Sequence, residues 1–381
     1  MKFSVPLSEF LKILQRILPA IPPKSTLPVL EHMYCSLSGS TLRIVATDQE
    51  LTITSSLAVF GEEDGEILIP ARRMAEITKA LSQEGSLEVS TDDAFQITLR
   101  TNSGQYTMKG MSPDEFPALP EFPEGTKIHF KKEEISRIAN KTVFAVSNEE
   151  YRPAMTGVLF QFKGDKLNTV ATDGYRLVRV MIPSSNGGFA DNLDVIIPAR
   201  AVDLLKKVDS DVEMSVTRTH AQFITGDTTI VTRVIDEKFP PYENVIPQDN
   251  DKVVTLPQRD IIAAIKRVSI FANSASKQIR LSLDERNINV RGEDEDNGSR
   301  ANENIPCDYS GTPLEIGFNH RYIEEALQNI GPEDTQDQNV VLTFSSATRA
   351  VLIKPYAAER ENDVLNQNDN LLMLVMPVRL S

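Results

Sequence analysis

The chain repeats itself three times at a nearly constant interval, and this feature constrains its fold more than any other. Residues 42–48 (LRIVATD) recur as residues 167–173 (LNTVATD) and, more weakly, as residues 288–294 (INVRGED). The aspartates that close these segments stand 125 and 121 residues apart. Self-similarity at a fixed period indicates repeated structural units. We therefore predict three copies of one domain.

Further landmarks keep the same order within the repeats. Pro28 and Pro153 each stand 20 residues before the closing aspartate of their repeat. The landmarks after the aspartate are Ile69–Arg72, Ile197–Arg200 and Ile316–Asn319 and, in the first two repeats, Phe116-Pro117 and Phe239-Pro240. Because several landmarks recur in one order, we place the domain boundaries at residues 1–125, 126–248 and 249–381.

Each repeat is predicted to contain two halves, each built of a strand, a helix and further strands. Residues 2–5, 127–130 and 253–256 are the opening strands. A helix follows, and in the first repeat its apolar residues at helical spacing are Leu7, Phe10, Leu11, Leu14 and Leu18. The second helix follows the Ile-Pro-Ala-Arg turn, where proline suits the first helical turn. Its apolar residues are Ala201, Leu204, Leu205 and Val208 in the middle repeat and Ile323, Ala326, Leu327 and Ile330 in the last. The fold class is therefore α+β, with helices on one face of antiparallel sheets.

The net charge of −14 argues at first against a nucleic-acid partner. The helical segments differ from this average: residues 8–24, 71–80, 131–141, 199–208 and 257–267 each carry +2, and residues 319–329 carry −1. The other 311 residues therefore carry −23. If helices line a ring, its lumen is basic and binds phosphates without reading bases, while the acidic exterior repels DNA. The plainer alternative is that these helices only have charged outer faces.

Most of the cations of these segments, with one arginine before the middle repeat's first proline, are the candidate DNA-binding residues. They are Lys12, Arg16, Lys24, Arg72, Arg73, Lys79, Arg137, Lys141, Arg152, Arg200, Lys206, Lys207, Lys266 and Arg267.

Nothing in the sequence indicates catalysis, a cofactor or a metal site. Cys35 and Cys307 lie far apart, and the four histidines form no metal-binding pair. Asp48, Asp173 and Asp294 invite a reading as paired acid–base carboxylates, but equivalent positions in three domains favour turn-capping residues. The chain has no nucleotide-binding loop and no apolar run long enough to cross a membrane. A cytoplasmic, non-enzymatic protein is expected.

Five short segments carry a resemblance to a known family. They are Thr26–Leu30, Val170–Leu177, Ile196–Arg200, Lys238–Tyr242 and Val375–Leu380. Together with the repeat, they resemble the bacterial sliding clamp, the beta subunit of DNA polymerase III, over the whole length. The resemblance implies the DNA-clamp fold, closed as a head-to-tail dimeric ring whose helices line the hole. It also implies a processivity factor that encircles duplex DNA, with the polymerase III alpha subunit, other polymerases, repair proteins and the clamp-loader complex as partners.

The resemblance further implies a cleft between the second and third domains that binds short hydrophobic peptide segments of these partners. By position its residues are Met155, Thr172, Gly174, Tyr175, Arg176, Leu177, Pro240, Val245, Asn319, Tyr322, Leu374, Val375, Met376, Pro377, Val378 and Arg379. The run from Leu371 to Pro377 fits this role, because a final core strand would explain alternate apolar residues but not both faces. A methionine there offers a deformable surface for many partners.

Ring closure is expected to join edges of the first and third domains. By position, Tyr106 and Met108 of one subunit would contact Ile270 and Phe271 of the next, although each is also an ordinary half-buried residue type. The acidic residues 293–296 would form salt bridges at this interface or be solvated. Residues 356–370 form a polar loop, longer than is usual in the family, to which we assign no function.

Two classes of function remain open after this reading. One is the DNA-encircling tether, and the other is a ring-shaped scaffold that binds proteins but no DNA. They differ in whether the ring is retained on circular DNA and released when the DNA is linearised.

Overall fold

The structure, a computed structural model, describes residues 1–81, 85–119, 122, 127–183, 193–331, 338–356 and 370–380. The chain forms two compact units, Met1–Ile135 with Lys207–Val234, and Ser136–Lys206 with Ile235–Ser381. The division runs through the middle repeat, so each unit holds one terminal repeat and part of the middle one. The polar loop predicted at residues 356–370 lies, apart from its two ends, outside the described residues.

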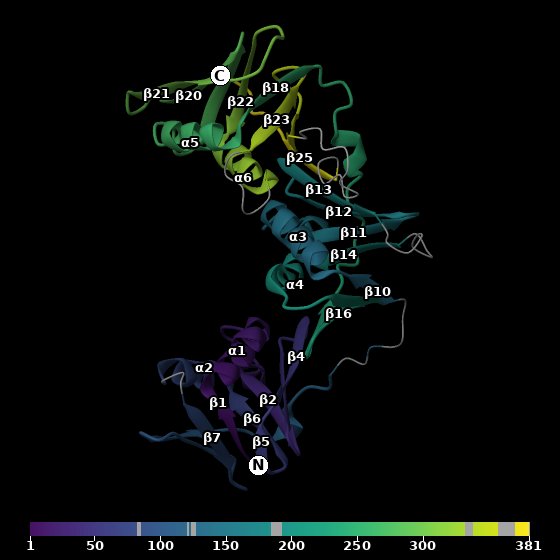
Figure 1. Ribbon diagram of the computed structural model, residues 1–381, viewed down its shortest axis with the longest axis vertical. Coiled ribbons are helices and arrows are strands. Elements are labelled where there is room, and N and C mark those ends of the chain that lie inside the picture. Colours follow the sequence, from purple (N-terminus) through teal and green to yellow (C-terminus); the bar gives the residue numbers. More distant parts are fainter. Residues whose placement is uncertain are drawn as a thin grey trace. The chain divides into compact units, whose positions relative to one another are not determined.

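The first unit contains a five-stranded and an eight-stranded sheet. In spatial order the smaller sheet is β5 (Phe60–Glu63), β1 (Lys2–Pro6), β7 (Ser86–Thr91), β8 (Gln96–Arg100) and β9 (Gln105–Lys109). The larger sheet is β10 (Lys127–Phe130), β15 (Val212–Val216), β16 (His220–Thr225), β17 (Thr228–Arg233), β4 (Leu51–Ala58), β3 (Thr41–Thr47), β2 (His32–Ser38) and β6 (Gly65–Pro70). Helices α1 (Leu7–Ile17) and α2 (Ala71–Ala80) pack side by side (Figure 1), α1 on β4 and β3 and α2 on β2 and β6.

The second unit contains an eight-stranded and a four-stranded sheet. The larger is β14 (Leu193–Pro198), β11 (Gly157–Lys163), β12 (Lys166–Thr172), β13 (Arg176–Pro183), β25 (Leu371–Val375), β24 (Val351–Pro355), β23 (Asn339–Phe344) and β18 (Lys252–Pro257). The smaller is β21 (Ser299–Pro306), β20 (Asn287–Asp294), β19 (Gln278–Asp284) and β22 (Leu314–Asn319). Helices α5 (Gln258–Ser269) and α6 (His320–Ile330) pack together, and α4 (Ala199–Asp203) packs on β11 and β14. Helix α3 (Lys132–Thr142) begins in the first unit and continues into the second.

The strand β17 pairs antiparallel with β4, and β25 pairs antiparallel with β13. Each pairing joins a strand of one repeat to a strand of the preceding repeat, so both large sheets run across a repeat boundary. The sequence predicts antiparallel sheets within each repeat, but no pattern in it indicates this continuity. Hydrogen bonding across the boundary shields strand edges that would otherwise be open.

Most helices begin directly after a proline. Pro6, Pro70, Pro198 and Pro257 occupy the position before α1, α2, α4 and α5. The sequence predicts that the proline of the Ile-Pro-Ala-Arg turn lies inside the first helical turn. In the structure, Pro70 and Pro198 stand one residue before α2 and α4 instead. Asn319 replaces proline before α6, and its side-chain oxygen accepts a hydrogen bond from the Arg321 amide.

The buried face of α1 differs in part from the prediction. Leu7, Phe10 and Leu14 are buried as expected, but Ile13 and Ile17 complete the face in place of Leu11 and Leu18. The helix ends at Ile17, and a 3-10 turn at Leu18–Ala20 follows because Pro19 cannot continue an α-helix. Lys24 therefore lies outside the helix to which its segment was assigned.

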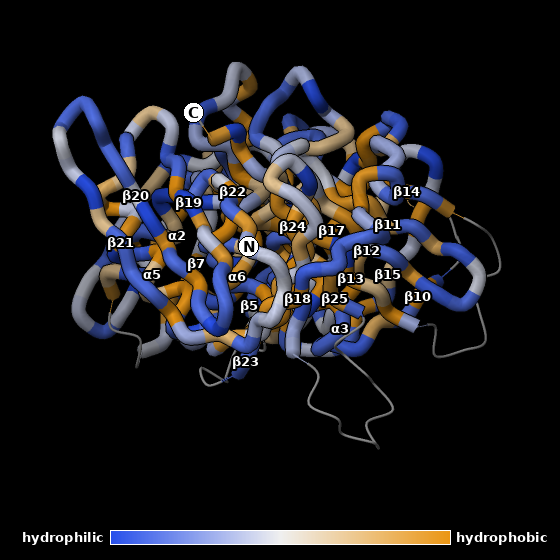
Figure 2. Tube along the Cα trace, turned by 90° about the horizontal axis from the view of Figure 1, so that it is seen from above, coloured by the Kyte–Doolittle hydropathy of each residue, from blue (hydrophilic) through white to orange (hydrophobic). Residues whose placement is uncertain are grey.

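The apolar run near the C-terminus is a core strand, contrary to the argument from its sequence. All five residues of β25 are buried, because the strand lies between β13 and β24. One face joins a hydrophobic cluster that includes Leu177, Leu352 and Tyr242, and helix α6 packs against the strand. Figure 2 shows the hydrophobic colour on segments near β24 and the hydrophilic colour along the β20–β21 hairpin. A strand covered on both faces is apolar on both, so its composition alone is no sign of a binding surface.

Candidate functional site

The turn between β12 and β13 is built by the side chains of Thr172 and Asp173. The Asp173 Oδ1 accepts hydrogen bonds from the amides of Tyr175 and Arg176, each at 2.9 Å. The Thr172 hydroxyl accepts from the Gly174 amide at 3.1 Å and donates to the Arg176 carbonyl at 2.6 Å. Gly174 has φ +89°, where glycine is favoured. The repeated aspartate is thus a turn-building residue, as predicted.

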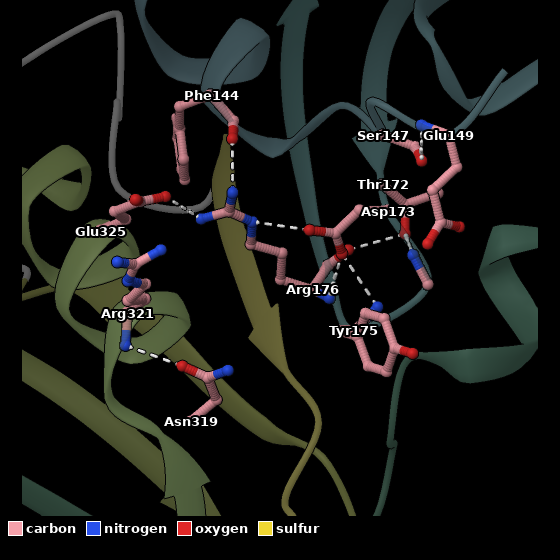
Figure 3. A network of polar contacts seen from close by, with 11 residues as sticks. Phe144, Ser147, Glu149, Thr172, Asp173, Tyr175, Arg176, Asn319, Arg321 and Glu325 are labelled. Atoms are coloured by element: carbon pink, nitrogen blue, oxygen red, sulfur yellow. Dashed lines mark hydrogen bonds and ion pairs between the residues drawn. The ribbon is translucent and has the colours of Figure 1, made fainter. Parts of the chain in front are cut away.

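Arg176 follows this turn and is nearly buried, with a relative exposure of 9%. Its Nε donates to Asp173 at 3.1 Å, its Nη2 donates to the Phe144 carbonyl at 2.7 Å, and its Nη1 pairs with Glu325 of α6 (Figure 3). The guanidinium carbon also lies 5.2 Å from the centre of the Phe144 ring and 5.1 Å from that of Tyr322. A buried cation needs partners of this kind. Arg176 therefore links the β12–β13 turn to α6.

An aromatic wall stands beside this arginine. The rings of Tyr175 and Tyr322 stack with their centres 5.6 Å apart and their planes at 10°. Tyr175 is 52% exposed, whereas burial raises the pKa of the Tyr322 phenol above its ordinary value. The carbonyl of Tyr175 accepts a hydrogen bond from the Met376 amide at 2.8 Å. This bond brings the C-terminal segment to the wall.

The C-terminal segment after β25 contributes exposed apolar surface. Met376 is 37% exposed, and Pro377 and Val378 are half-buried. The Val378 amide donates to the Gly317 carbonyl at 2.9 Å, which holds the segment against β22. Arg379 is exposed. Asn319 is occupied as the N-cap of α6, so its amide oxygen already has a partner.

The segment that precedes the last repeat carries a further exposed apolar residue. Val245 is 51% exposed, Pro240 is half-buried, and the Tyr242 hydroxyl donates to Gln161 at 2.8 Å. Beneath them, Leu177 and Leu374 are each 2% exposed and belong to the core cluster.

The predicted cleft residues therefore have two different roles in the fold. Tyr175, Val245 and Met376 are accessible apolar groups, with half-buried Met155, Pro240 and Tyr322 as support. The buried ones are Thr172, Arg176, Leu177, Leu374 and Val375. Sequence reasoning missed Phe144 and Glu325, which hold Arg176, and also Tyr151, which is 73% exposed and lies 5.4 Å from the Arg152 guanidinium. No local motif marks Phe144 or Glu325, which lie far from Arg176 in the sequence.

The predicted DNA-binding cations also separate into groups. In the part of the chain that the structure describes, Lys24, Arg73, Lys79 and Lys207 are exposed and form no ion pair. Arg72 is exposed and donates to the Ile21 carbonyl at 2.9 Å, and Arg200 is exposed. Lys12 pairs with Glu9, Arg16 with Asp209, and Lys206 with Asp203.

Two cations of α3 lie deeper. Lys141 is only 8% exposed, and its Nζ donates to the Gly331 carbonyl at 2.5 Å. Arg137 is half-buried, and desolvation lowers the pKa of its guanidinium. The Lys141 ammonium group is therefore bonded inside the protein and is largely shielded from solvent.

The cations of the second unit are mostly paired with carboxylates. Arg267 donates to Glu303 through Nε at 2.8 Å and Nη2 at 2.7 Å, a bidentate pair that raises the pKa of the arginine and lowers that of the glutamate. Lys266 lies 4.0 Å from Glu324, and Arg152 lies 3.7 Å from Glu149. The positive charge available to a phosphate is therefore greater in the first unit.

The residues predicted at the subunit interface lie near sheet edges. Tyr106 and Met108 are on β9, the edge strand of the five-stranded sheet. Ile270 and Phe271 follow α5, with exposures of 78% and 41%. Of the acidic residues 293–296, Glu293 pairs with Arg291, and Asp294 and Asp296 accept from Asn273.

Neither cysteine suggests a metal or redox site. Cys35 is buried and Cys307 is half-buried, and burial raises the pKa of each thiol. Among the described residues, no group of histidine, cysteine and carboxylate side chains has the arrangement of a metal site. No helix in the described ranges has the length and apolar character needed to span a bilayer.

Comparisons with known proteins agree along the chain. Three family models match, described as the N-terminal, central and C-terminal domains of the DNA polymerase III beta subunit, at residues 1–120, 129–241 and 243–368. The beta sliding clamp of Synechococcus elongatus is 30% identical over 373 residues, which cover 95% of this chain and 94% of that protein. The beta sliding clamp of Pseudomonas aeruginosa is 28% identical over the whole of both chains.

Solved structures give the same result for the fold. A Pseudomonas aeruginosa sliding clamp bound to griselimycin superposes with a TM-score of 0.90 at 27% identity, over the full length of both chains. The beta sliding clamp of C. crescentus superposes with a TM-score of 0.88 at 26% identity, over 100% of this chain and 99% of that one.

Proposed function

Because this chain belongs to the family of DNA polymerase III beta subunits, the bacterial beta sliding clamps, we propose a mechanism for it as a ring that tethers polymerases to DNA. It has the α+β clamp fold and acts as a processivity factor. The observation that carries this conclusion is the match of three successive clamp domains along the chain. We place the domains at residues 1–125, 126–248 and 249–381, as the repeat indicates.

We propose that two copies close head to tail into a ring around duplex DNA, with the helices toward the hole. The sheet edge at β9, which carries Tyr106 and Met108, and the exposed Ile270 and Phe271 are the expected contacts between copies. Closure would cover an open sheet edge and exposed apolar groups. A solution mass of twice 42.4 kDa is the expected result, and a stable monomer would contradict it.

We propose that DNA is held without its sequence being read, because contacts from lysine and arginine to phosphates position a duplex but carry no base information. The exposed cations that have no ion pair with any described residue, Lys24, Arg73, Lys79 and Lys207, are the first candidates for this contact. The other members of the proposed set are Lys12, Arg16, Arg72, Arg137, Arg152, Arg200, Lys206, Lys266 and Arg267. We leave Lys141 out of direct contact because it is buried.

The partner-binding cleft follows from the aromatic wall and the C-terminal segment. We propose that a partner inserts apolar side chains between Tyr175, Val245 and Met376, which are exposed beside a rigid network around Arg176. Partners would include the polymerase III alpha subunit, other polymerases, repair proteins and the clamp-loader complex. Tethering keeps a partner near its primer at high effective concentration, so that dissociation is followed by rebinding. No catalytic step or cofactor is required, and the cytoplasm is the expected location.

The test of encirclement is retention on circular DNA. The clamp should be loaded onto primed circular DNA by the clamp-loader complex and ATP, and should leave when the circle is cut. Replacing Arg73, Lys79 and Lys207 with glutamate should weaken loading, whereas the control Lys166→Glu, an exposed cation on β12, should not. Retention on linear DNA would refute encirclement, and no association with circular DNA would favour the protein-binding scaffold.

The test of the cleft is the loss of polymerase stimulation in a dimer that still forms. Met376→Ala together with Tyr175→Ala removes the two largest exposed apolar side chains of the proposed cleft and should weaken polymerase binding at least about tenfold. Phe60→Ala is a matched control, since this aromatic residue is also exposed but lies on β5 in the first unit, outside the proposed set. Full stimulation by the double variant would contradict the cleft.

A further inference from the structure

The turn between β3 and β4 in the first unit reproduces the turn between β12 and β13. The Asp48 Oδ1 accepts from the amides of Glu50 and Leu51 at 3.1 and 2.7 Å. The Thr47 hydroxyl accepts from the Gln49 amide at 3.0 Å. Gln49 has φ +76°, close to the φ +89° of the equivalent Gly174. The backbone that presents the aromatic wall of the cleft is therefore present twice in the chain.

The strands beside the two turns keep the same register. Thr52 of β4 pairs with Val231 of β17, as Leu177 of β13 pairs with Leu374 of β25. The Arg233 amide donates to the Glu50 carbonyl at 2.9 Å. That bond is the counterpart of the bond from Met376 to Tyr175, at 2.8 Å. The two sites therefore share the pairing of the adjacent strands as well as the conformation of the turn.

A pocket of about 230 Å³ opens beside the turn in the first unit. Its lining residues are Thr47, Gln49, Glu50, Thr52, Pro117, Ala118, His220 and Val231. Pro117 follows Phe116 as Pro240 follows Phe239, so a Phe-Pro segment borders both sites. The pocket thus lies at the place in the first unit that corresponds to the proposed cleft in the second.

The side chains around this pocket restrict the ligands that it can bind more than those around the cleft do. Glu50 stands where the cleft has Tyr175, Thr52 where it has Leu177, and Arg233 where it has Met376. Glu50 and Arg233 form an ion pair at 3.4 Å, whereas the equivalent residues of the cleft, Tyr175 and Met376, are exposed apolar groups. The hydroxyls of Thr47 and Thr52 bond to each other at 2.8 Å, so Thr52, Val231, Pro117 and Ala118 offer mainly carbon atoms.

We propose that this pocket is a second peptide-binding site, which takes an extended segment that inserts a single aliphatic side chain. The proposal rests on the peptide cleft of the proposed function, whose backbone it shares. The volume suits one leucine-sized side chain, and the missing aromatic and leucine groups make binding at least about tenfold weaker than at the cleft.

The test is a titration of the full dimer with the peptide acetyl-Ser-Gln-Leu-Ser-Ser-amide, followed by methyl NMR. The methyls of Thr52, Ala118 and Val231 report on the pocket, and those of Leu177 and Leu374 report on the cleft. Saturable shifts at both groups, with the weaker affinity at the pocket, are expected. Shifts at the cleft alone would overturn the second site and leave the cleft standing. Shifts at neither would reject the second site and count against the cleft.

Two sets of variants establish that the shifts come from the pocket. Ala118→Phe should fill it and remove the shift at Val231, while the exposed control Ala94→Phe should not. The combination Glu50→Tyr, Thr52→Leu and Arg233→Met restores the side chains of the cleft. It should raise the affinity of the pocket about tenfold, and an unchanged affinity would contradict the shared architecture.

Discussion

The turns at Asp48 and Asp173 share the hydrogen bonds from backbone amides to the threonine and aspartate side chains, but they differ in the residue that ends each turn. In the first turn this residue is Leu51, which is 3% exposed. In the second it is Arg176, which has three polar partners and two aromatic rings around it. The threonine and aspartate are thus sufficient for the turn. The residue that ends the turn determines its further contacts. Leu51 packs in the apolar core, whereas Arg176 binds α6 through Glu325.

Replacing the terminal residue of each turn should give the largest difference between them. Arg176→Met should lower the free energy of unfolding by about 3 kcal/mol, since Asp173 and the Phe144 carbonyl lose a buried partner. Leu51→Met changes only the shape of an apolar side chain and should cost about 1 kcal/mol. Urea unfolding followed by circular dichroism measures both. Equal losses would show that the ion network adds nothing to the second turn.

The Arg176→Met variant should also differ from Leu51→Met in polymerase binding. Without Arg176, the Tyr322 ring and Glu325 lose a common partner, so the aromatic wall should become less ordered. Polymerase binding should weaken roughly tenfold, and the Leu51→Met clamp should bind as before. A Glu325→Gln variant tests the mechanism, because it keeps the shape and removes the charge. Undiminished polymerase binding by Arg176→Met would show that the contacts of Arg176 are not needed for the cleft to bind its partner.

Removing the aspartates should give a smaller and more similar effect. Asp48→Ala deletes an acceptor for two amides and should cost about 1 kcal/mol. Asp173→Ala also deprives Arg176 of an ion pair at 3.1 Å and should cost about 2 kcal/mol. The excess should vanish when both aspartate variants are made with Arg176→Met already present, which a double-mutant cycle measures. An excess that persists would mean that Asp173 acts through some other contact.

Much of the fold could be predicted from local patterns. The opening strand at Lys127–Phe130 and the buried residues Ile323, Ala326, Leu327 and Ile330 of α6 were predicted correctly, since periodicity within one element reveals its buried face. The face of α1 was partly wrong because the 3-10 turn at Leu18–Ala20 ends the helical period early. The sheets that cross repeat boundaries were missed, because pairing such as Thr52 with Val231 is not encoded in local periodicity.

The candidate site was predictable only where a residue acts through its own turn. Asp173 was recognised as a turn residue because its partners follow within three positions. Glu325 lies 149 residues from Arg176, and nothing near either residue predicts that pair. The burial of Lys141 was likewise hidden, since its partner Gly331 is 190 residues away. The net charge of a helical segment, counted from its sequence, therefore overestimates the charge that is accessible to a ligand.

The smallest expected effect concerns the residue with positive φ in each turn. Gly174→Ala should cost about 1 kcal/mol, because φ +89° strains a side-chain-bearing residue, although its Cβ would meet only the mobile end of Arg152. The reverse change, Gln49→Gly, should alter stability by less than about 0.5 kcal/mol, since relief of strain at φ +76° is offset by the greater freedom of glycine in the unfolded chain. Both are measured by the shift in urea midpoint. A loss from Gln49→Gly as large as that from Gly174→Ala would show that the Gln49 side chain makes a contact that stabilises its turn.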